Sequence, residues 1–386
     1  FNIMAGSPTG TEPSVFDTAF FAAIFLTIFA ILFGTRLPGQ RRDSNRGMMI
    51  AIAFESIVKL IAFVLVGLFC TFQLFDGFDH LFALAHHDPA VATVFRTNFS
   101  QWGLATQLVL ASLAIICLPR QFHVTFVESP DEERYRNNAR WIFPLYLLGF
   151  IVFVVPIAAA GLLKFGGLAP PDAFVLLLPM AFNNEPLAAL AFLGGLSAAT
   201  GMILVSTLAL AIMVANELLL PLLFRSSSEE LRERRDLSWI TVMVRRLSII
   251  GIMALAWLDY QSATSERSLA SIGLVAFVAA AQFAPALLGG LYWRQGNQYG
   301  AFAGMLIGLM IWLLMLVLPE LSDGPLETLQ PLLILPVDPL TNAVVVSLGL
   351  NLLTYVLISL VTTSRLIDRV QSATFVDVMS PSSKSG

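Results

Sequence analysis

Long apolar stretches separated by short polar and basic segments dominate the pattern of this chain. A helix needs about 20 mostly apolar residues to cross the hydrocarbon core of a bilayer, and nine stretches meet or approach that length. The predicted segments are Val15–Thr35, Met48–Phe72, Gly103–Leu118, Trp141–Leu163, Leu187–Phe224, Ile240–Asp259, Leu269–Tyr292, Ala301–Leu318 and Thr341–Thr363. They are apolar on every face, whereas strands of a membrane barrel alternate with period two. We therefore predict an all-α, polytopic transmembrane helix bundle of about nine helices.

Composition supports a membrane protein and excludes several soluble classes. The chain is 57% hydrophobic and 12% charged, whereas a soluble domain carries about 25% charged residues. A soluble fold cannot hide so much apolar sequence, because burial saturates near 75% of the surface of the chain. The net charge of −4 provides no basic surface for nucleic acid. The predicted environment, and the first partner of the chain, is the lipid bilayer.

The distribution of Lys and Arg predicts the orientation in the membrane. With Phe1–Ser14 outside and the helices alternating, most of the 22 Lys and Arg residues fall on the cytoplasmic side. The outer segments then hold Arg96, Lys164 and Arg267, and Lys59 lies within a predicted helix. We predict that the N-terminus of this chain is outside and that its C-terminus is cytoplasmic.

One acid–base pair lies inside a predicted helix. Glu55 and Lys59 stand at i and i+4, with Glu on the N-terminal side, which is the better orientation for an intrahelical ion pair. Ionisable groups at membrane depth are costly and are candidates for function. The pair either belongs to a polar pathway or gate, or is a self-neutralised pair packed against a neighbouring helix.

The fifth predicted helix carries a set of small and hydroxyl residues. Ser197 and Thr200 are three positions apart and share a face, as do Gly194 and Gly201. Small residues allow close helix packing, and hydroxyl groups form hydrogen bonds between helices. The same hydroxyl oxygens are ligands that Na⁺ takes in transporters. Tight packing and a cation site are both compatible with this spacing.

No motif in the chain indicates an enzyme active site or a strong metal site. Cys70 and Cys117 lie in apolar runs, which fits neither a disulfide nor a metal pair. His80, His86 and His87 fall in a predicted outer loop, where solvent exposure is the simpler interpretation and weak metal binding the alternative. We predict no catalytic residue, no metal site, and no cofactor other than Na⁺.

Four stretches carry motifs whose order and spacing extend over nearly the whole chain. The stretches are Phe33–Arg36 followed by Arg46–Leu60, then Leu118–Val124, then Ser197–Met202 with Asn216–Leu218 downstream, and Leu291–Arg294 with Gly300. Together they resemble the sodium:solute symporter family, and more closely its copies that are fused to bacterial sensor histidine kinases.

This resemblance implies a LeuT-type fold with two inverted five-helix repeats, broken helices and a binding site near the middle of the membrane. It also implies a fragment, because about thirteen helices are expected and roughly four would precede Phe1. The expected domains are a partial transporter-like domain, residues 1–365, and a cytoplasmic linker and tail, residues 366–386. The run Asp368–Asp377 looks like the linker to a cytoplasmic kinase module in cis. The expected location is the bacterial inner (plasma) membrane.

Specific residues can be carried over from the family pattern. Ser197 falls where the family offers a hydroxyl group to Na⁺, and Thr200 is near a second such position. The neighbouring position, often Ser or Thr in symporters, is Ala198 here, which favours a sensor with altered coupling. Arg120 and His123 belong to the cytoplasmic Leu118–Val124 motif, and Leu118–Arg120 is a candidate for the break in the third helix.

Three functional hypotheses follow. The first is the membrane domain of a transporter-like sensor histidine kinase that binds a small solute, such as an amino acid or carboxylate, and signals to a kinase absent from this chain. The second is part of a plain Na⁺/solute symporter. The third is a membrane scaffold without a ligand.

Overall fold

The computed structural model describes residues 18–34, 41–88, 91–92, 101–127, 132–166, 168–226, 238–262, 269–321 and 338–363. All regular structure in these ranges is helical. The predicted all-α bundle is confirmed. The chain forms two compact units: residues 1–96 with 126–265 make up unit 1, and residues 97–125 with 266–386 make up unit 2.

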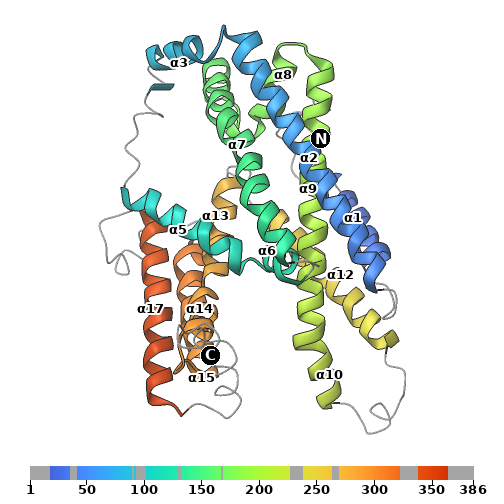
Figure 1. The fold of residues 1–386 in the computed structure, drawn as a ribbon, viewed down its shortest axis with the longest axis vertical. Coiled ribbons are helices and arrows are strands. Elements are labelled where there is room, and N and C mark those ends of the chain that lie inside the picture. Colours follow the sequence, from blue (N-terminus) through green and yellow to red (C-terminus); the bar gives the residue numbers. More distant parts are fainter. Residues whose placement is uncertain are drawn as a thin grey trace. The chain divides into compact units, whose positions relative to one another are not determined.

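Unit 1 contains long helices α2, α7 and α9, with the short helices α3 and α8 at one end of the unit (Figure 1). Its elements are α1 (Thr18–Gly34), α2 (Arg41–Leu68), η1 (Phe69–Leu74), α3 (Phe78–His87), α7 (Glu132–Phe165), η3 (Pro171–Ala173), α8 (Phe174–Ala181), α9 (Glu185–Met213), η4 (Val214–Leu219), α10 (Leu220–Ser226) and α12 (Ser238–Ser262).

Local sequence accounts for several helix ends in unit 1. The π-helix η1 ends at Phe75, which is extended, and Gly77 then turns the chain with φ of 110°. Glycine tolerates this left-handed conformation because it has no Cβ. At the start of α9, the Asn184 side chain accepts a hydrogen bond from the backbone N–H of Leu187 at 3.3 Å. This N-cap and Pro186 in the first turn fix where α9 begins.

The core of unit 1 lies where η1, α3, α7 and α8 meet. Val66, Cys70, Leu81, Phe174 and Leu178 are buried there in one apolar cluster. Large apolar side chains on the outer faces of the long helices are exposed, as the lipid-facing side of a membrane helix requires. The pattern is that of a bundle with a small interior and an apolar outer surface.

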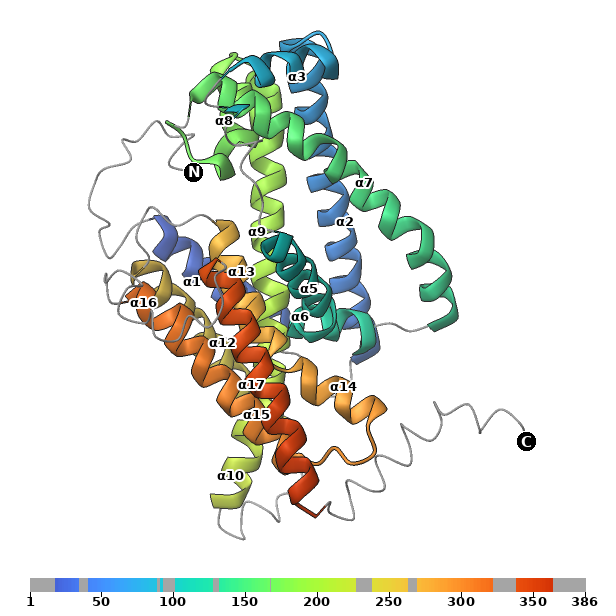
Figure 2. The same ribbon diagram turned by 90° about the vertical axis from the view of Figure 1, so that its left-hand side faces the viewer.

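Unit 2 is organised around the pair α15 and α17, which run side by side (Figure 2). Its elements are α5 (Gln101–Cys117), α6 (Pro119–Phe122), η2 (His123–Val127, where the chain returns to unit 1), α13 (Leu269–Ala281), α14 (Ala284–Tyr292), α15 (Gln298–Trp312), η5 (Leu313–Val317), α16 (Leu318–Leu321) and α17 (Pro339–Val361).

Each of the nine predicted segments contains a helix within the residues that the structure describes. Seven helices in the described ranges are long and apolar enough to cross a membrane, and the bent pair Trp102–Cys117 with Pro119–Phe126 makes eight. The remaining predicted segment, Val15–Thr35, corresponds to α1, whose apolar part Ala19–Leu32 is shorter than a full span. The short apolar helix Pro171–Ala181 was not predicted, since its run is too short to be distinguished from a loop.

One detail of the prediction is confirmed, one feature was not predicted, and other predictions fall outside the described residues. The third helix breaks at Leu118, which is extended, and the helices on either side are bent by 49°. The long fifth segment divides into α9, η4 and α10, so a π-helical stretch interrupts it. The predicted outer end Phe1–Ser14, the linker Asp368–Asp377 and the boundary between residues 365 and 366 lie outside the described ranges.

Candidate functional site

Glu55 and Lys59 form the ion pair that their spacing predicts. The Lys59 Nζ lies 3.5 Å from the Glu55 Oε1 on α2. The Glu55 side chain is 11% exposed and that of Lys59 is 29% exposed, so the carboxylate is the more enclosed partner. A partly enclosed pair interacts more strongly than a surface pair, because less water screens it. The carboxylate therefore needs a cation beside it, and Lys59 provides one.

The Glu55 carboxylate lies directly against α9. A Cβ atom added to Gly201 would overlap the Glu55 Oε2, and the Oε1 would be 2.9 Å away. About two turns earlier along α9, a Cβ on Gly194 would lie 2.6 Å from the Ala62 Cβ and 3.7 Å from the Lys59 Cα. The two glycines thus allow α2 and α9 to approach closely, as small residues do in membrane helix pairs.

Ser197 lies on α9 between these two glycines, and Thr200 directly precedes Gly201. Ser197 is three residues after Gly194 and four before Gly201, so all three share the stripe that faces α2. Both hydroxyl residues are half-buried. The structure therefore brings the predicted hydroxyl face of α9 to the helix that carries the predicted ion pair.

The Thr200 hydroxyl is held by its own helix. It lies 2.8 Å from the Leu196 carbonyl oxygen, to which it donates, and 3.1 Å from the Ser197 carbonyl oxygen. Its own oxygen keeps lone pairs that a cation can use. The backbone of α9 is continuous from Glu185 to Met213, so the unwound carbonyl groups of a broken helix are not present at Ser197 or Thr200.

Two residues that were not predicted join this contact from α2 and α7. The Tyr146 side chain of α7 interacts electrostatically with Ser56 and Glu55 of α2. The Ser56 hydroxyl donates to the Ile52 carbonyl oxygen at 2.8 Å. A tyrosine within an apolar helix is typical of membrane sequences and gives no signal of its own, so sequence reasoning could not assign Tyr146 to this site.

Further along α9, the predicted Asn216–Leu218 motif falls in the π-helix η4. The Arg245 guanidinium of α12 donates to the Asn216 Oδ1 at 3.4 Å, and Glu217 is exposed. Single-turn π-helices occur often at functional positions. This contact ties η4 to α12 within unit 1.

Arg120 and His123 lie at the bend that follows α5. Arg120 is half-buried in α6 and His123 is 9% exposed at the start of η2. The backbone N–H of His123 donates to the carbonyl oxygens of Arg120 and Pro119. Both residues belong to unit 2, whereas Glu55, Lys59, Ser197 and Thr200 belong to unit 1. They are thus a separate motif in the fold.

The histidines of the predicted outer loop lie on or near α3. His86 and His87 are exposed at its C-terminal end, and the His80 Nδ1 accepts a long 3.4 Å hydrogen bond from the Asp76 backbone N–H. Among the described residues, no group of three or more His, Cys, Asp or Glu side chains is placed to hold a metal ion.

Unit 2 contains a buried amide network that the sequence analysis did not identify. The Asn351 Nδ2 donates to the Gln282 carbonyl oxygen at 2.8 Å and to its Oε1 at 3.0 Å, and the Gln282 Nε2 donates to the Ser347 Oγ at 3.1 Å. All three side chains are at most 1% exposed. The helix face that packs on this network carries glycines at four-residue spacing, Gly300, Gly304 and Gly308. This spacing was the sequence feature from which a close helix contact could have been predicted.

Comparison with known families gives one result. Residues 151–308 match the model of the sodium:solute symporter family. The match supports a transporter-like membrane function. It includes Ser197 and Thr200, and it does not reach Glu55, Lys59 or Arg120. No curated protein and no solved structure gives a significant match.

Proposed function

We propose that this chain is the membrane domain of a transporter-like protein that responds to Na⁺ and a small solute, such as an amino acid or carboxylate. One observation carries the proposal: the Glu55 carboxylate lies against Gly201, on the α9 stripe that also bears Ser197. An anionic oxygen and hydroxyl oxygens gathered at a close helix contact are the ligands that a hard cation takes in transporters.

In this proposal Na⁺ competes with Lys59 for the Glu55 carboxylate. The ammonium lies 3.5 Å from that carboxylate, so a second cation at the same place is repelled unless Lys59 moves away. Lysine has a long flexible stem and can withdraw its charge without a change in the backbone. Cation binding would then replace an intrahelical contact on α2 by a contact between α2 and α9.

The proposed mechanism is alternating access. A ligand shifts a two-state equilibrium only by its difference in affinity for the two states. A Na⁺ ion bound between Glu55 and the hydroxyl groups of Ser197 and Thr200 would favour the state in which α2 and α9 are in contact. Solute binding would be coupled to Na⁺ through the same equilibrium, and the coupling would be reciprocal.

The finer assignment is a sensor histidine kinase of the bacterial inner membrane, with the kinase in cis after Gly386. The resemblance of the motifs and the presence of Ala198 in place of a second hydroxyl group support this assignment over a plain Na⁺/solute symporter. The gene sequence that follows Gly386 discriminates between the two: kinase modules support the sensor, and a nearby stop codon supports the symporter.

The cation site is tested with Na⁺ itself as the probe. The full-length protein is purified and its thermal midpoint is measured in NaCl, KCl and choline chloride at equal ionic strength. We expect NaCl to raise the midpoint, because a ligand that binds the folded state stabilises it by RT ln(1 + [L]/Kd). The Ser197→Ala variant should lose most of this increase.

The matched control is Ser112→Ala, because Ser112 is an exposed hydroxyl residue within another apolar helix, α5, where it donates to the Leu108 carbonyl oxygen at 2.8 Å. This control should respond to NaCl as the parent protein does. An undiminished response to NaCl in Ser197→Ala would refute the assignment of the cation to α9.

A further inference from the structure

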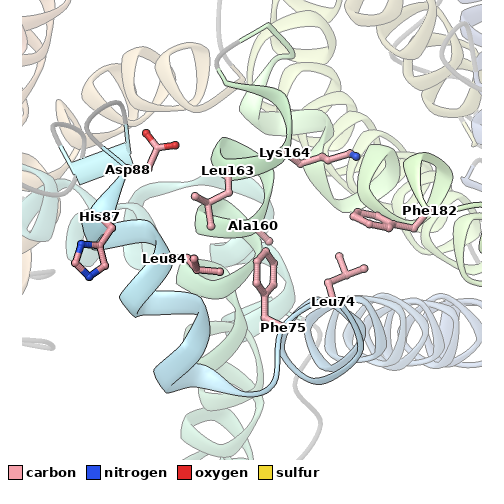
Figure 3. Close-up of a pocket in the computed structure, with 9 residues that line it drawn as sticks. All are labelled: Leu74, Phe75, Leu84, His87, Asp88, Ala160, Leu163, Lys164 and Phe182. Atoms are coloured by element: carbon pink, nitrogen blue, oxygen red, sulfur yellow. The ribbon is translucent and has the colours of Figure 1, made fainter.

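A cavity of about 440 Å³ lies at the end of unit 1 where α3 and the last turns of α7 meet (Figure 3). Its volume is within the range of small-molecule binding sites. The wall is mainly apolar, with Leu74 and Phe75 at the end of η1, Leu84 on α3, and Leu163 on α7. The cavity is formed by elements of unit 1 alone.

One cation is placed at the rim of this cavity. Lys164 lies in the last turn of α7, and its Nζ is 4.8 Å from the centre of the Phe182 ring. The Lys164 side chain is exposed. No ion pair to this ammonium occurs among the described residues. Its positive charge is therefore available to a ligand in the cavity.

The opposite side of the cavity carries a negative charge. Figure 3 shows Asp88 and Lys164 on opposite sides of Leu163 and Ala160. The Asp88 Oδ1 accepts a 3.4 Å hydrogen bond from the backbone N–H of Val91 at the end of α3. A ligand that fills the apolar space thus meets a cation at one side and an anion at the other.

We propose that this cavity binds a small monocarboxylate with an apolar chain. The carboxylate would pair with the Lys164 ammonium, and the chain would lie against Phe75, Leu84 and Leu163. A second carboxylate at the far end of such a ligand would approach Asp88, so dicarboxylates of the same length are disfavoured. The site is distinct from the contact between α2 and α9, and the inference does not rest on Na⁺ binding there.

The test uses octanoate as the probe and the full-length protein in lipid nanodiscs. Binding is measured by isothermal titration calorimetry, with empty nanodiscs as the reference for partition into lipid. Octanamide, which is neutral, and octanedioate, which has a second carboxylate, are compared at the same chain length. We expect octanoate to bind roughly tenfold more tightly than octanamide, because a hydrogen bond to a charged group contributes more than a neutral one. It should also bind more tightly than octanedioate, whose second carboxylate approaches Asp88.

Variants separate the role of the charge from that of the apolar wall. Lys164→Met keeps the unbranched stem and should weaken octanoate binding roughly tenfold, whereas Lys164→Arg should restore it. Lys384→Met removes one positive charge elsewhere in the chain and should leave binding unchanged. Leu84→Trp places a larger side chain at a wall position that is 40% exposed, and it should abolish binding with the charge intact.

A carboxylate ligand could come from solution or from the bilayer. Nanodiscs loaded with palmitate distinguish these sources: competition with octanoate that depends on Lys164 indicates a lipid-derived ligand, and its absence indicates a soluble one. Equal binding of octanoate and octanamide, or equal octanoate binding by the parent protein and Lys164→Met, would overturn the proposal. In that case Lys164 only contacts Phe182 and the helix C-terminus. Octanoate binding that persists in Ser197→Ala would separate this result from failure of the cation site.

Discussion

Two helix pairs in this protein pack through glycines, and they differ in what the glycines face. In unit 1, the nearest atoms to Gly201 of α9 belong to the movable end of the Glu55 side chain on α2, and the nearest atom to Gly194 is the Ala62 Cβ. In unit 2, Gly304 of α15 faces the backbone of α17, where an added Cβ would be 2.8 Å from the Asn351 carbonyl oxygen. The backbones of α15 and α17 therefore approach each other at a point where neither can yield.

The polar groups at the two contacts differ in charge and in burial. Neutral amides in unit 2 form a fully buried network, in which Asn351 makes two hydrogen bonds to Gln282. The polar groups in unit 1 are a charged pair and two hydroxyl groups that are partly exposed. A buried network with its hydrogen bonds made fixes one arrangement, whereas a partly exposed charged pair can exchange partners. The comparison indicates that α15–α17 is a structural contact and that α2–α9 is the contact suited to change.

The largest expected effect is that of Gly304→Val. The new side chain must displace the α17 backbone, so we expect a loss of roughly 1–3 kcal/mol or failure to fold. The measurement is the thermal midpoint by fluorescence-detected size-exclusion chromatography. Gly349→Val is the matched control, because a Cβ on Gly349 meets no atom within 4 Å. Equal midpoints for the two variants would contradict close packing of α15 on α17.

The next effect concerns the amide network. Asn351→Leu removes both hydrogen bonds to Gln282 and leaves the Gln282 carbonyl oxygen and Oε1 without these donors. The free energy of unfolding should fall by about 1–2 kcal/mol. The double variant Gln282→Leu/Asn351→Leu should cost less than the sum of the two single variants, because neither amide is then left buried without the other. Denaturation by a titrated detergent measures all three. Strict additivity would show that the two side chains do not interact.

A smaller effect on stability is expected for Lys59→Met. Removing a partly exposed ion-pair partner should cost up to about 1 kcal/mol without Na⁺. In NaCl the loss should be recovered, because the cation replaces the ammonium beside Glu55. The NaCl concentration for half of the thermal shift should fall several-fold, since the competing charge is gone. An unchanged half-saturation concentration would show that Lys59 and Na⁺ do not compete.

The smallest effect on stability is expected for Gly201→Ala. Alanine favours a helix over glycine by about 1 kcal/mol, and its Cβ displaces only the carboxylate end of Glu55, so the thermal midpoint without Na⁺ should change little. The Na⁺-dependent shift should nevertheless fall several-fold, because Glu55 has moved. Gly195→Ala serves as the control, since open space surrounds that position. A normal Na⁺ response in Gly201→Ala would remove Glu55 from the proposed site.

The membrane helices were predictable because their signal is local. An apolar stretch that enters lipid must form a helix to satisfy its backbone polar groups, and each of the nine stretches contains a helix among the described residues. The break at Leu118 was also predictable, because Pro119 follows it and disfavours helical backbone at the residue before proline. Helix α8 and the π-helices were missed, because short apolar runs and single extra residues in a helical turn leave no clear periodicity.

The candidate site shows the same division between local and distant information. The pairing of Glu55 with Lys59, and the shared face of Ser197 with Gly194 and Gly201, follow from helical spacing alone. That the Glu55 carboxylate lies on Gly201 follows only from the packing of α2 on α9, which joins parts of the chain far apart in sequence.

The amino-acid sequence by itself determined that this chain enters a membrane, where its helices run and which residues pair along one helix, because each of these depends on neighbours within a few turns. The tertiary structure decided which helix faces meet. It placed Glu55 against α9, joined Gln282 to Asn351 and enclosed the cavity beside Lys164. Helix packing depends on a close fit between small residues of segments that are far apart in sequence. Because these helices are apolar on every face, the sequence pattern does not show which face of one helix packs against another.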